Sequence, residues 1–349
     1  MNDAALVIAV ETRENARDFD AEIDEFEALA QAAGATVLDR IVQRRDTVDP
    51  ATLVGSGKAH EIAERAEELG ARLLLVLNDL RPRQRKNLEK IVPLPIVDRT
   101  MLILDVFARQ ARSREGKLQV ELAQLRYRQS NLIGGGADLS RLGGGIGTRG
   151  PGETKLEVDR RRIGERISTL NRILAEVRRQ RSLRRSAQHR EKLVALVGYT
   201  NVGKSSLLNA IARSDAYVAD RPFATLDPTV RRAYLGPGAY ARIADTVGFI
   251  TDLPKDLVNA FRATLEELRE ADLLLHVLDA ANPRWPRQRS AVETILHELE
   301  LDGAPRLLVF NKCDLPHTQA TQEPTALCVS ARTGEGLVAL RAALMTSLA

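Results

Sequence analysis

The chain has 349 residues, of which 44% are hydrophobic and 28% are charged, a composition typical of a globular protein rather than a fibrous or disordered one. This length favours two or three domains. Apolar runs such as residues 73–77 are far shorter than the roughly 18 to 20 residues that span a bilayer, so we expect no stable membrane insertion. No basic segment precedes an apolar one near residue 1, and we therefore expect a cytoplasmic protein without a secretory signal.

Charge is unevenly distributed along the chain. The formal net charge is +4, but residues 108–192 contain 21 Lys or Arg and only 9 Asp or Glu. A basic segment within an otherwise acidic protein indicates a polyanionic partner for that segment. One arginine run inside it could be only a solvated helix face, although its basic surroundings favour contact with nucleic acid: Arg178, Arg179, Arg181, Arg184 and Arg185.

Residues 1–100 alternate short apolar runs with segments of helical period, which predicts a small N-terminal α/β domain with a largely parallel sheet. The expected strands are residues 4–10, 35–42, 72–77 and 95–97, and the expected helices are residues 16–33, 57–69 and 83–91. The segment Gly55-Ser56-Gly57-Lys58 resembles a phosphate-binding turn. It lacks a recognisable magnesium-binding carboxylate nearby, so an ordinary helix N-terminus is the simpler interpretation.

In residues 101–191 the strand signal disappears, and apolar side chains follow two helical stripes that predict a basic helical hairpin. Between the stripes, nine of the nineteen residues 134–152 are glycine. Because glycine loses the most backbone entropy on ordering, we expect a long flexible loop at the tip of the hairpin. The loop could be a simple linker, but Arg141 and Arg149 within it favour contact with RNA phosphates.

At residue 193 a buried strand, residues 193–197, leads directly into a glycine-rich segment and then a helix over residues 206–212. This is the strand, loop and helix context of a P-loop, in which backbone N–H groups and the helix N-terminus bind phosphates. We expect Lys204 to reach the β- and γ-phosphates and the Ser205 hydroxyl to bind magnesium. The expected nucleotide-binding residues are Gly198, Tyr199, Thr200, Asn201, Val202, Gly203, Lys204, Ser205 and Ser206.

Two later motifs predict that the base is guanine. The strand ending at residues 309–310 opens into Asn311-Lys312-Cys313-Asp314, the N-K-x-D pattern of Ras-like GTPases. The Asp314 carboxylate can accept hydrogen bonds from N1–H and the exocyclic amine of guanine, which adenine does not offer in that arrangement. Asn311 would connect the loops around the base, and the stem of Lys312 would cover the purine. After a strand at residues 327–329, Ser330-Ala331-Arg332 resembles the S-A-K loop that contacts guanine O6.

A third pair of segments is expected to surround the γ-phosphate. A strand at residues 241–244 leads to Asp245-Thr246-Val247-Gly248, 41 residues after Lys204, where Asp245 would hold magnesium and the Gly248 N–H would meet the γ-phosphate. The first switch lies within residues 220–229. A threonine there should complete the magnesium shell, and Thr225 and Thr229 both qualify by residue type.

The motifs F-A-T-L-D-P-T at 223–229, D-T-V-G-F-I at 245–250 and G-Y-T-N-V-G-K-S-S at 198–206 resemble the HflX family of GTPases, within the Obg-HflX superfamily. The resemblance extends to V-G-S-G-K at 54–58, to residues 109–125 and to residues 143–157. It favours Thr225 as the switch threonine, so that Ser205, Thr225 and Asp245 form the metal site and Lys204, Thr225 and Gly248 act in catalysis. Further nucleotide contacts are then expected at Phe223, Ala224, Leu226 and Asp227.

The resemblance implies a GTPase that uses Mg²⁺ and binds the large ribosomal subunit, with residues 108–192 directed toward ribosomal RNA. Family members are associated with splitting or rescuing stalled ribosomes under stress. Because this chain ends soon after Leu337, we expect the additional C-terminal domain of some relatives to be missing or reduced. Phe249 follows the D-T-V-G, where Ras-like enzymes have a glutamine that orients water, so we expect slow intrinsic hydrolysis and stimulation by a partner.

The sequence therefore predicts three parts: an α/β domain at residues 1–100, a basic helical hairpin at 101–191 and a Ras-like G domain at 192–349. We expect a monomer. Alternative functions are a ribosome-assembly GTPase, an RNA-remodelling ATPase that uses residues 1–100, and a signalling GTPase, the last of which leaves the basic segment unexplained. Cys313 and Cys328 are expected to be small buried residues rather than a disulfide.

Overall fold

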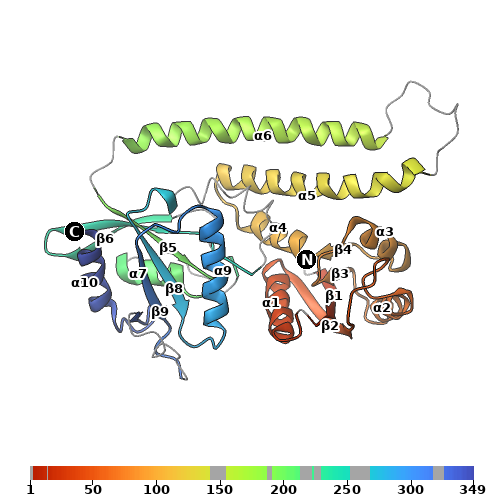
Figure 1. Ribbon diagram of the computed structural model, residues 1–349, viewed down its shortest axis with the longest axis horizontal. Coiled ribbons are helices and arrows are strands. Elements are labelled where there is room, and N and C mark those ends of the chain that lie inside the picture. The colour runs from red at the N-terminus through yellow and green to blue at the C-terminus, as the bar shows by residue number, and fades with distance from the viewer. Residues whose placement is uncertain are drawn as a thin grey trace. The chain divides into compact units, whose positions relative to one another are not determined.

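The computed structural model describes residues 3–13, 15–141, 155–186, 191–212, 222–223, 229–251, 268–316 and 326–349. The chain forms two compact units, one comprising Met1–Arg109 and Val120–Ile173 and the other Gln110–Gln119 and Leu174–Ala349. Each unit contains a largely parallel sheet with helices packed on it (Figure 1), so the predicted α/β class is confirmed. The predicted boundaries at residues 100 and 191 stay predictions. Among the described helices, none has a stretch long and apolar enough to cross a membrane.

The first unit is built on a four-stranded sheet whose order is β2-β1-β3-β4. Every neighbouring pair is parallel, as predicted. Strands β1, β3 and β4 are mostly buried and appear in the sequence as apolar runs, whereas most residues of the edge strand β2 are exposed or partly buried. The strands are β1 (Asp3–Glu11), β2 (Ala35–Arg44), β3 (Leu73–Val76) and β4 (Ile96–Asp98).

Helices pack against this sheet and against one another. Three of them confirm the helical segments expected in residues 1–100: α1 (Phe19–Ala32), α2 (Ser56–Glu68) and α3 (Pro82–Ile91). A core of fully buried side chains joins β1 and β3 to α2 and α3, including Leu6, Ile8, Leu74, Ile62 and Leu88. The fourth helix, α4 (Arg99–Gln110), was not anticipated, because its consecutive apolar residues hide the helical period in a short segment.

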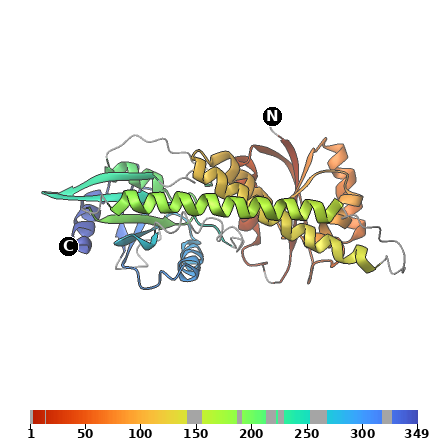
Figure 2. The same cartoon turned by 90° about the horizontal axis from the view of Figure 1, so that it is seen from above.

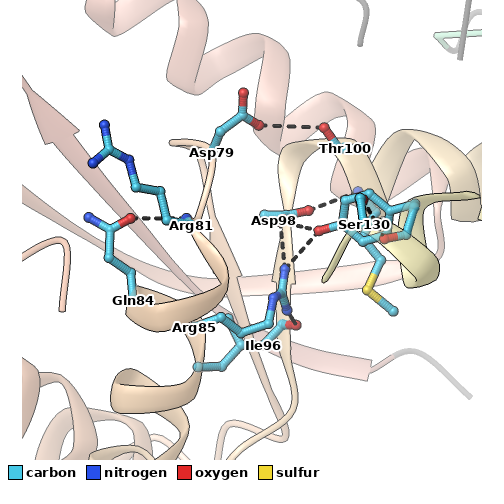
Figure 3. A network of polar contacts seen from close by, with 10 residues as sticks. Asp79, Arg81, Gln84, Arg85, Ile96, Asp98, Thr100 and Ser130 are labelled. Atoms are coloured by element: carbon cyan, nitrogen blue, oxygen red, sulfur yellow. Dashed lines mark hydrogen bonds and ion pairs between the residues drawn. The ribbon is translucent and has the colours of Figure 1, made fainter. Parts of the chain in front are cut away.

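A polar network lies where β4 ends (Figure 3). The side chain of Asp98 is 3% exposed, and it accepts hydrogen bonds from the Arg85 guanidinium at 2.5 Å, the Met101 N–H at 2.9 Å and the Tyr127 hydroxyl. Arg85 also donates to the carbonyl of Ile96 at 2.6 Å. Burial, and then the negative charge of Asp98, raise the pKa of Tyr127. Because Tyr127 belongs to the next helix, α5 (Arg114–Arg141), the network ties α3, β4, α4 and α5 together.

Two long helices, α5 (Arg114–Arg141) and α6 (Lys155–Ser186), confirm the predicted helical segments of the middle region. They lie side by side (Figures 1 and 2), and the Arg166 guanidinium of α6 donates two hydrogen bonds, at 2.7 and 3.0 Å, to Glu121 of α5. The expectation of an irregular loop over residues 134–152 is wrong for residues 134–141, where α5 continues. A glycine inside a helix costs only about 1 kcal/mol relative to alanine, which a long helix tolerates. Residues 142–152 lie outside the described part of the chain.

The second unit contains a six-stranded sheet in the order β10-β9-β8-β5-β7-β6. All pairs are parallel except β6 with β7. The strands are β5 (Leu193–Gly198), β6 (Thr229–Gly236), β7 (Ala239–Asp245), β8 (Leu273–Asp279), β9 (Arg306–Asn311) and β10 (Leu327–Cys328). Helix α7 packs on β6 and β7, α9 on β5 and β8, and α10 on β6; these helices are α7 (Lys204–Ala212), α9 (Trp285–Glu298) and α10 (Leu337–Leu348).

Neither Cys313 nor Cys328 forms a disulfide. The expectation that both are buried is wrong. Cys313 is only partly buried, and Cys328 is exposed, since β10 is a two-residue edge strand that is paired with β9 alone.

Candidate nucleotide-binding site

The predicted P-loop connects β5 to α7 in the second unit. Strand β5 is completely buried, and its last residue, Gly198, is followed by a turn that ends at Lys204, the first residue of α7. A side chain at Gly203, whose φ is 89°, would collide with the Nδ2 atom of Asn311. At Gly198 a side chain would collide with the carbonyl of Val277 on β8. The turn is therefore packed so closely against β8 and β9 that only glycine fits at these two positions.

Lys204 is only 6% exposed, although it carries an amine. Its Nζ donates hydrogen bonds to the carbonyls of Tyr199, at 2.8 Å, and Gly198, at 3.1 Å. Burial lowers the pKa of Lys204 from 10.5 to about 8, and the nearby carboxylate of Asp245 opposes this shift. A buried ammonium that is held by neutral carbonyls gains stability from an anion beside it, so this lysine is suited to bind phosphate.

The next residue, Ser205, contacts the carboxylate that is expected to hold the metal. The Ser205 hydroxyl donates to Oδ2 of Asp245 at 2.5 Å, and Asp245 is 2% exposed at the end of β7. Thr246 turns its hydroxyl away to the carbonyl of Leu196, at 2.6 Å. A hydroxyl and a carboxylate are oxygen ligands of the kind that Mg²⁺ prefers. The donor set therefore fits the expected metal, for which Ser205 and Asp245 would supply oxygen ligands.

The segment that follows Asp245 packs against the P-loop. Thr200 N–H donates to the carbonyl of Phe249 at 2.7 Å, and Phe249 N–H donates to the carbonyl of Gly198 at 3.1 Å. The phenyl ring of Phe249 is 2% exposed, so it lies in the protein interior rather than in solvent beside a phosphate. In addition, the hydroxyl of Tyr199 contacts Thr251. The sequence analysis missed this last contact, because nothing in the motif relates the two side chains.

The N-K-x-D residues come from the end of β9. Asn311 is 2% exposed, and its amide donates to the carbonyl of Val202 at 2.9 Å and accepts from the Ala331 N–H at 3.0 Å. The side chain of Asn311 thus joins the P-loop to the loop after β10. Lys312 has a φ of 64°, and its Nζ pairs with Asp279 of β8 at 2.7 Å. Cys313 and Asp314 follow in a turn, where both are partly exposed.

The second segment that is expected to contact the base is a tight turn after β10. Ser330 is completely buried, and its hydroxyl accepts the N–H of Thr333 at 3.0 Å. Its carbonyl accepts the N–H of Gly334 at 2.9 Å. Ala331 is held by Asn311, as described above, while Arg332 is exposed. These bonds fix the backbone of this turn relative to the N-K-x-D residues.

The remaining predicted residues are placed as follows. Val202 is 1% exposed, Asn201 has a φ of 61° and Ser206 lies in the first turn of α7. Val247 is 6% exposed, and a side chain at Gly248 would lie 3.2 Å from Nζ of Lys204. Phe223 is buried in a turn, whereas four expected switch residues lie outside the described part of the chain: Ala224, Thr225, Leu226 and Asp227. The alternative threonine, Thr229, begins β6 and is paired with Asp245.

Comparison with known families agrees with this arrangement. Residues 20–108 match the family model described as GTP-binding GTPase N-terminal, and residues 110–188 match GTP-binding GTPase Middle Region. Residues 193–312, which contain the P-loop, the D-T-V-G segment and Asn311, match the model described as 50S ribosome-binding GTPase. The three models together span most of the chain.

Individual proteins extend the comparison over the whole chain. The sequence is 48% identical over 328 residues to GTPase HflX of Caldanaerobacter subterraneus, covering 93% of this chain and 77% of that protein. It is 46% identical over 336 residues to GTPase HflX of Escherichia coli, covering 94% of this chain and 79% of that protein. A crystal structure of a GTP-binding protein from Sulfolobus solfataricus in complex with GDP has the same fold, with a TM-score of 0.51, 22% identity and coverage of 100% and 99%. The chain belongs to the HflX family of GTPases, and it is a GTP hydrolase.

Proposed function

We propose that this protein is a magnesium-dependent, guanine-specific GTPase that acts on the large ribosomal subunit. The observation that carries the proposal is the buried Lys204, which lies in a P-loop with Ser205 and Asp245 in contact at its end. The Asn311 amide connects that P-loop to the loops expected to hold the base. Phosphate, metal and base recognition therefore converge on one edge of the sheet.

Each residue has a distinct role in this proposal. The Lys204 ammonium stabilises negative charge on the β- and γ-phosphates, and the P-loop N–H groups bind the remaining phosphate oxygens. Ser205 and Asp245, together with Thr225, would hold Mg²⁺, which would supply positive charge to neutralise the phosphates. Gly248 donates its N–H to the γ-phosphate, and Asp314 accepts the hydrogen bonds of guanine.

The position of Phe249 bears on the rate of hydrolysis. A phenyl ring neither donates nor accepts a hydrogen bond with the attacking water, and this ring is buried. Ras-like enzymes with a glutamine at this position turn over at only about 10⁻⁴ to 10⁻² s⁻¹ alone, and partner groups add roughly 10³ to 10⁵. We therefore expect slow hydrolysis by the isolated protein and stimulation by the ribosome.

The basic segment 108–192 supports an RNA partner. Its excess of arginine and lysine matches the charge of ribosomal RNA, and the G domain matches a family described as ribosome-binding. In this proposal the GTP form of a cytoplasmic monomer binds the large subunit, and hydrolysis releases it. Splitting or rescue of stalled ribosomes under stress is the cellular role that the family resemblance favours.

Sedimentation through sucrose gradients tests the proposal. The full chain is mixed with purified large subunits, small subunits or intact ribosomes, in the presence of a non-hydrolysable GTP analogue or GDP. In the presence of the GTP analogue, we expect the protein to cosediment with large subunits and intact ribosomes. We expect much less cosedimentation in the presence of GDP, and none with small subunits. Equal binding in both nucleotides would contradict the proposed switch, and preference for immature particles would support an assembly factor instead.

A further inference from the structure

The side chain of Tyr199 connects the P-loop to the segment after D-T-V-G. Its hydroxyl accepts the Thr251 N–H at 2.9 Å and shares a hydrogen bond with the Thr251 hydroxyl at 2.8 Å. Tyr199 is only 4% exposed, and the intervening residue Ile250 is completely buried. We call this pair of hydrogen bonds the Tyr199–Thr251 latch.

The latch reinforces a backbone connection between the same two segments. Residues 199 and 249 form a parallel bridge, in which the Thr200 N–H and the Phe249 N–H make the two hydrogen bonds described above. Four hydrogen bonds thus hold residues 248–251 against the P-loop. Because they are sheltered from water, each contributes more than it would at the surface.

In this arrangement Gly248 lies against Thr200 and Lys204, where the proposed function places a γ-phosphate. A Cβ atom at Gly248 would lie 3.0 Å from the Cα of Thr200 and 3.2 Å from Nζ of Lys204. The Thr200 N–H, which belongs to the phosphate-binding turn, already donates to the carbonyl of Phe249. A γ-phosphate between Lys204 and Gly248 must therefore displace residues 248–251, whereas GDP carries no group at that place.

We propose that Tyr199 is a specificity-determining residue that sets the relative affinity for GTP and GDP. The latch stabilises the arrangement that excludes a γ-phosphate, so GTP must break it and GDP need not. A ligand shifts a two-state equilibrium only by its different affinity for the two states. In the wild-type protein, GTP binding must include the free-energy cost of breaking the latch, which lowers the affinity for GTP and leaves the affinity for GDP unchanged. This inference rests on the proposed nucleotide site, but it assigns to the Tyr199 hydroxyl a role that phosphate binding by the backbone does not require.

The Tyr199→Phe variant removes the hydroxyl and keeps the ring that fills the interior. We expect the ratio of affinities for a non-hydrolysable GTP analogue over GDP, measured by displacement of a fluorescent guanine nucleotide, to rise by about 2- to 10-fold, the range for one or two hydrogen bonds. Tyr240→Phe is the matched control, since Tyr240 is exposed near the start of β7, at the other end of that strand from Asp245, and should leave the ratio unchanged.

Thr251→Ala provides a second variant that tests the same contact from the other side. It should raise the ratio in the wild-type background and have a smaller effect when combined with Tyr199→Phe, because the two groups act as a pair. Equal loss of affinity for both nucleotides would mean that Tyr199 only supports the fold. An unchanged ratio with unchanged affinities would mean that the latch does not oppose GTP. Either result would contradict this inference and leave the proposed function intact. Failure of the wild-type protein to prefer guanine nucleotides would instead overturn the proposed function.

Discussion

The two units each contain a largely parallel sheet, but the carboxyl ends of their parallel strands differ in what they offer a ligand. In the second unit, β5 ends in a glycine-rich turn with a buried ammonium at Lys204. In the first unit, the same edge is occupied by the protein's own polar side chains. Asn78, just after β3, makes two hydrogen bonds with the backbone of Val10, and Asp98 binds Arg85 and Tyr127.

A favourable position in the fold is therefore not sufficient for a nucleotide site. Ligands of open parallel sheets bind at the carboxyl ends of strands, and both units present such an edge. The G-S-G-K segment of the first unit begins α2 at Ser56, as the simpler interpretation expected, and Lys58 pairs with Glu61 of the same helix at 2.5 Å. Lys204, in contrast, is held by neutral carbonyls and is ready to receive an anion.

Replacing either Lys204 or Lys58 by alanine should give the largest difference between the units, measured as the rate of GTP hydrolysis. Lys204→Ala removes the charge that contacts the terminal phosphates, so we expect GTP hydrolysis to fall by about 10³-fold or more. Lys58→Ala should change the rate by less than about twofold, because its ammonium only pairs with an exposed glutamate. Phosphate release measured at saturating GTP checks both. Survival of turnover in Lys204→Ala would mean that another site hydrolyses the nucleotide.

Replacing Asp314 tests whether the second unit recognises guanine through this carboxylate. Asp314→Ala leaves the hydrogen-bond donors of the base without acceptors, so we expect affinity for GDP to fall by about 10²- to 10³-fold. Inosine diphosphate lacks the exocyclic amine, and the wild-type protein should bind it more weakly than GDP. The variant should bind the two nucleotides almost equally. A variant that still distinguishes them would place recognition of the amine elsewhere.

The polar network of the first unit should matter for stability and not for nucleotide binding. Asp98→Ala leaves the Arg85 guanidinium largely buried without its carboxylate, which costs about 3 kcal/mol. Hydrogen exchange of the β3 and β4 amides should accelerate accordingly, while GDP affinity stays within about twofold. The control is Asp46→Ala, which removes an exposed ion pair with Arg13 and should change neither quantity. Loss of GDP affinity in Asp98→Ala would contradict the separation of the two units' roles.

The smallest effect concerns pH. Burial lowers the pKa of Lys204 to about 8, and the negative charge of a bound nucleotide should raise it again. Well below pH 8 the lysine is charged with or without nucleotide, so it contributes no pH dependence there. Above pH 8 binding must take up a proton, and affinity should fall by at most about tenfold per pH unit. Calorimetry at pH 9 in two buffers of different ionisation enthalpy should detect this proton, and identical heats would contradict it.

The parts of this structure that were predictable are those determined by local pattern. Strands such as β1 and β5 are continuous apolar runs, and the P-loop and N-K-x-D residues lie in short motifs at strand ends. Helix α4 and the exposure of Cys328 were not predictable, because each depends on which elements cover the segment. The contacts Tyr199 to Thr251 and Asp98 to Tyr127 join residues 52 and 29 positions apart, and no pattern in one sequence relates them.

We propose that, of the two largely parallel sheets, only the second binds a nucleoside triphosphate. Titration calorimetry of the wild-type protein with a non-hydrolysable GTP analogue and the matching ATP analogue tests this. We expect one GTP analogue bound per chain and no detectable binding of the ATP analogue in the presence of magnesium. Two bound nucleotides per chain, or ATP binding that disappears in Lys58→Ala, would contradict it.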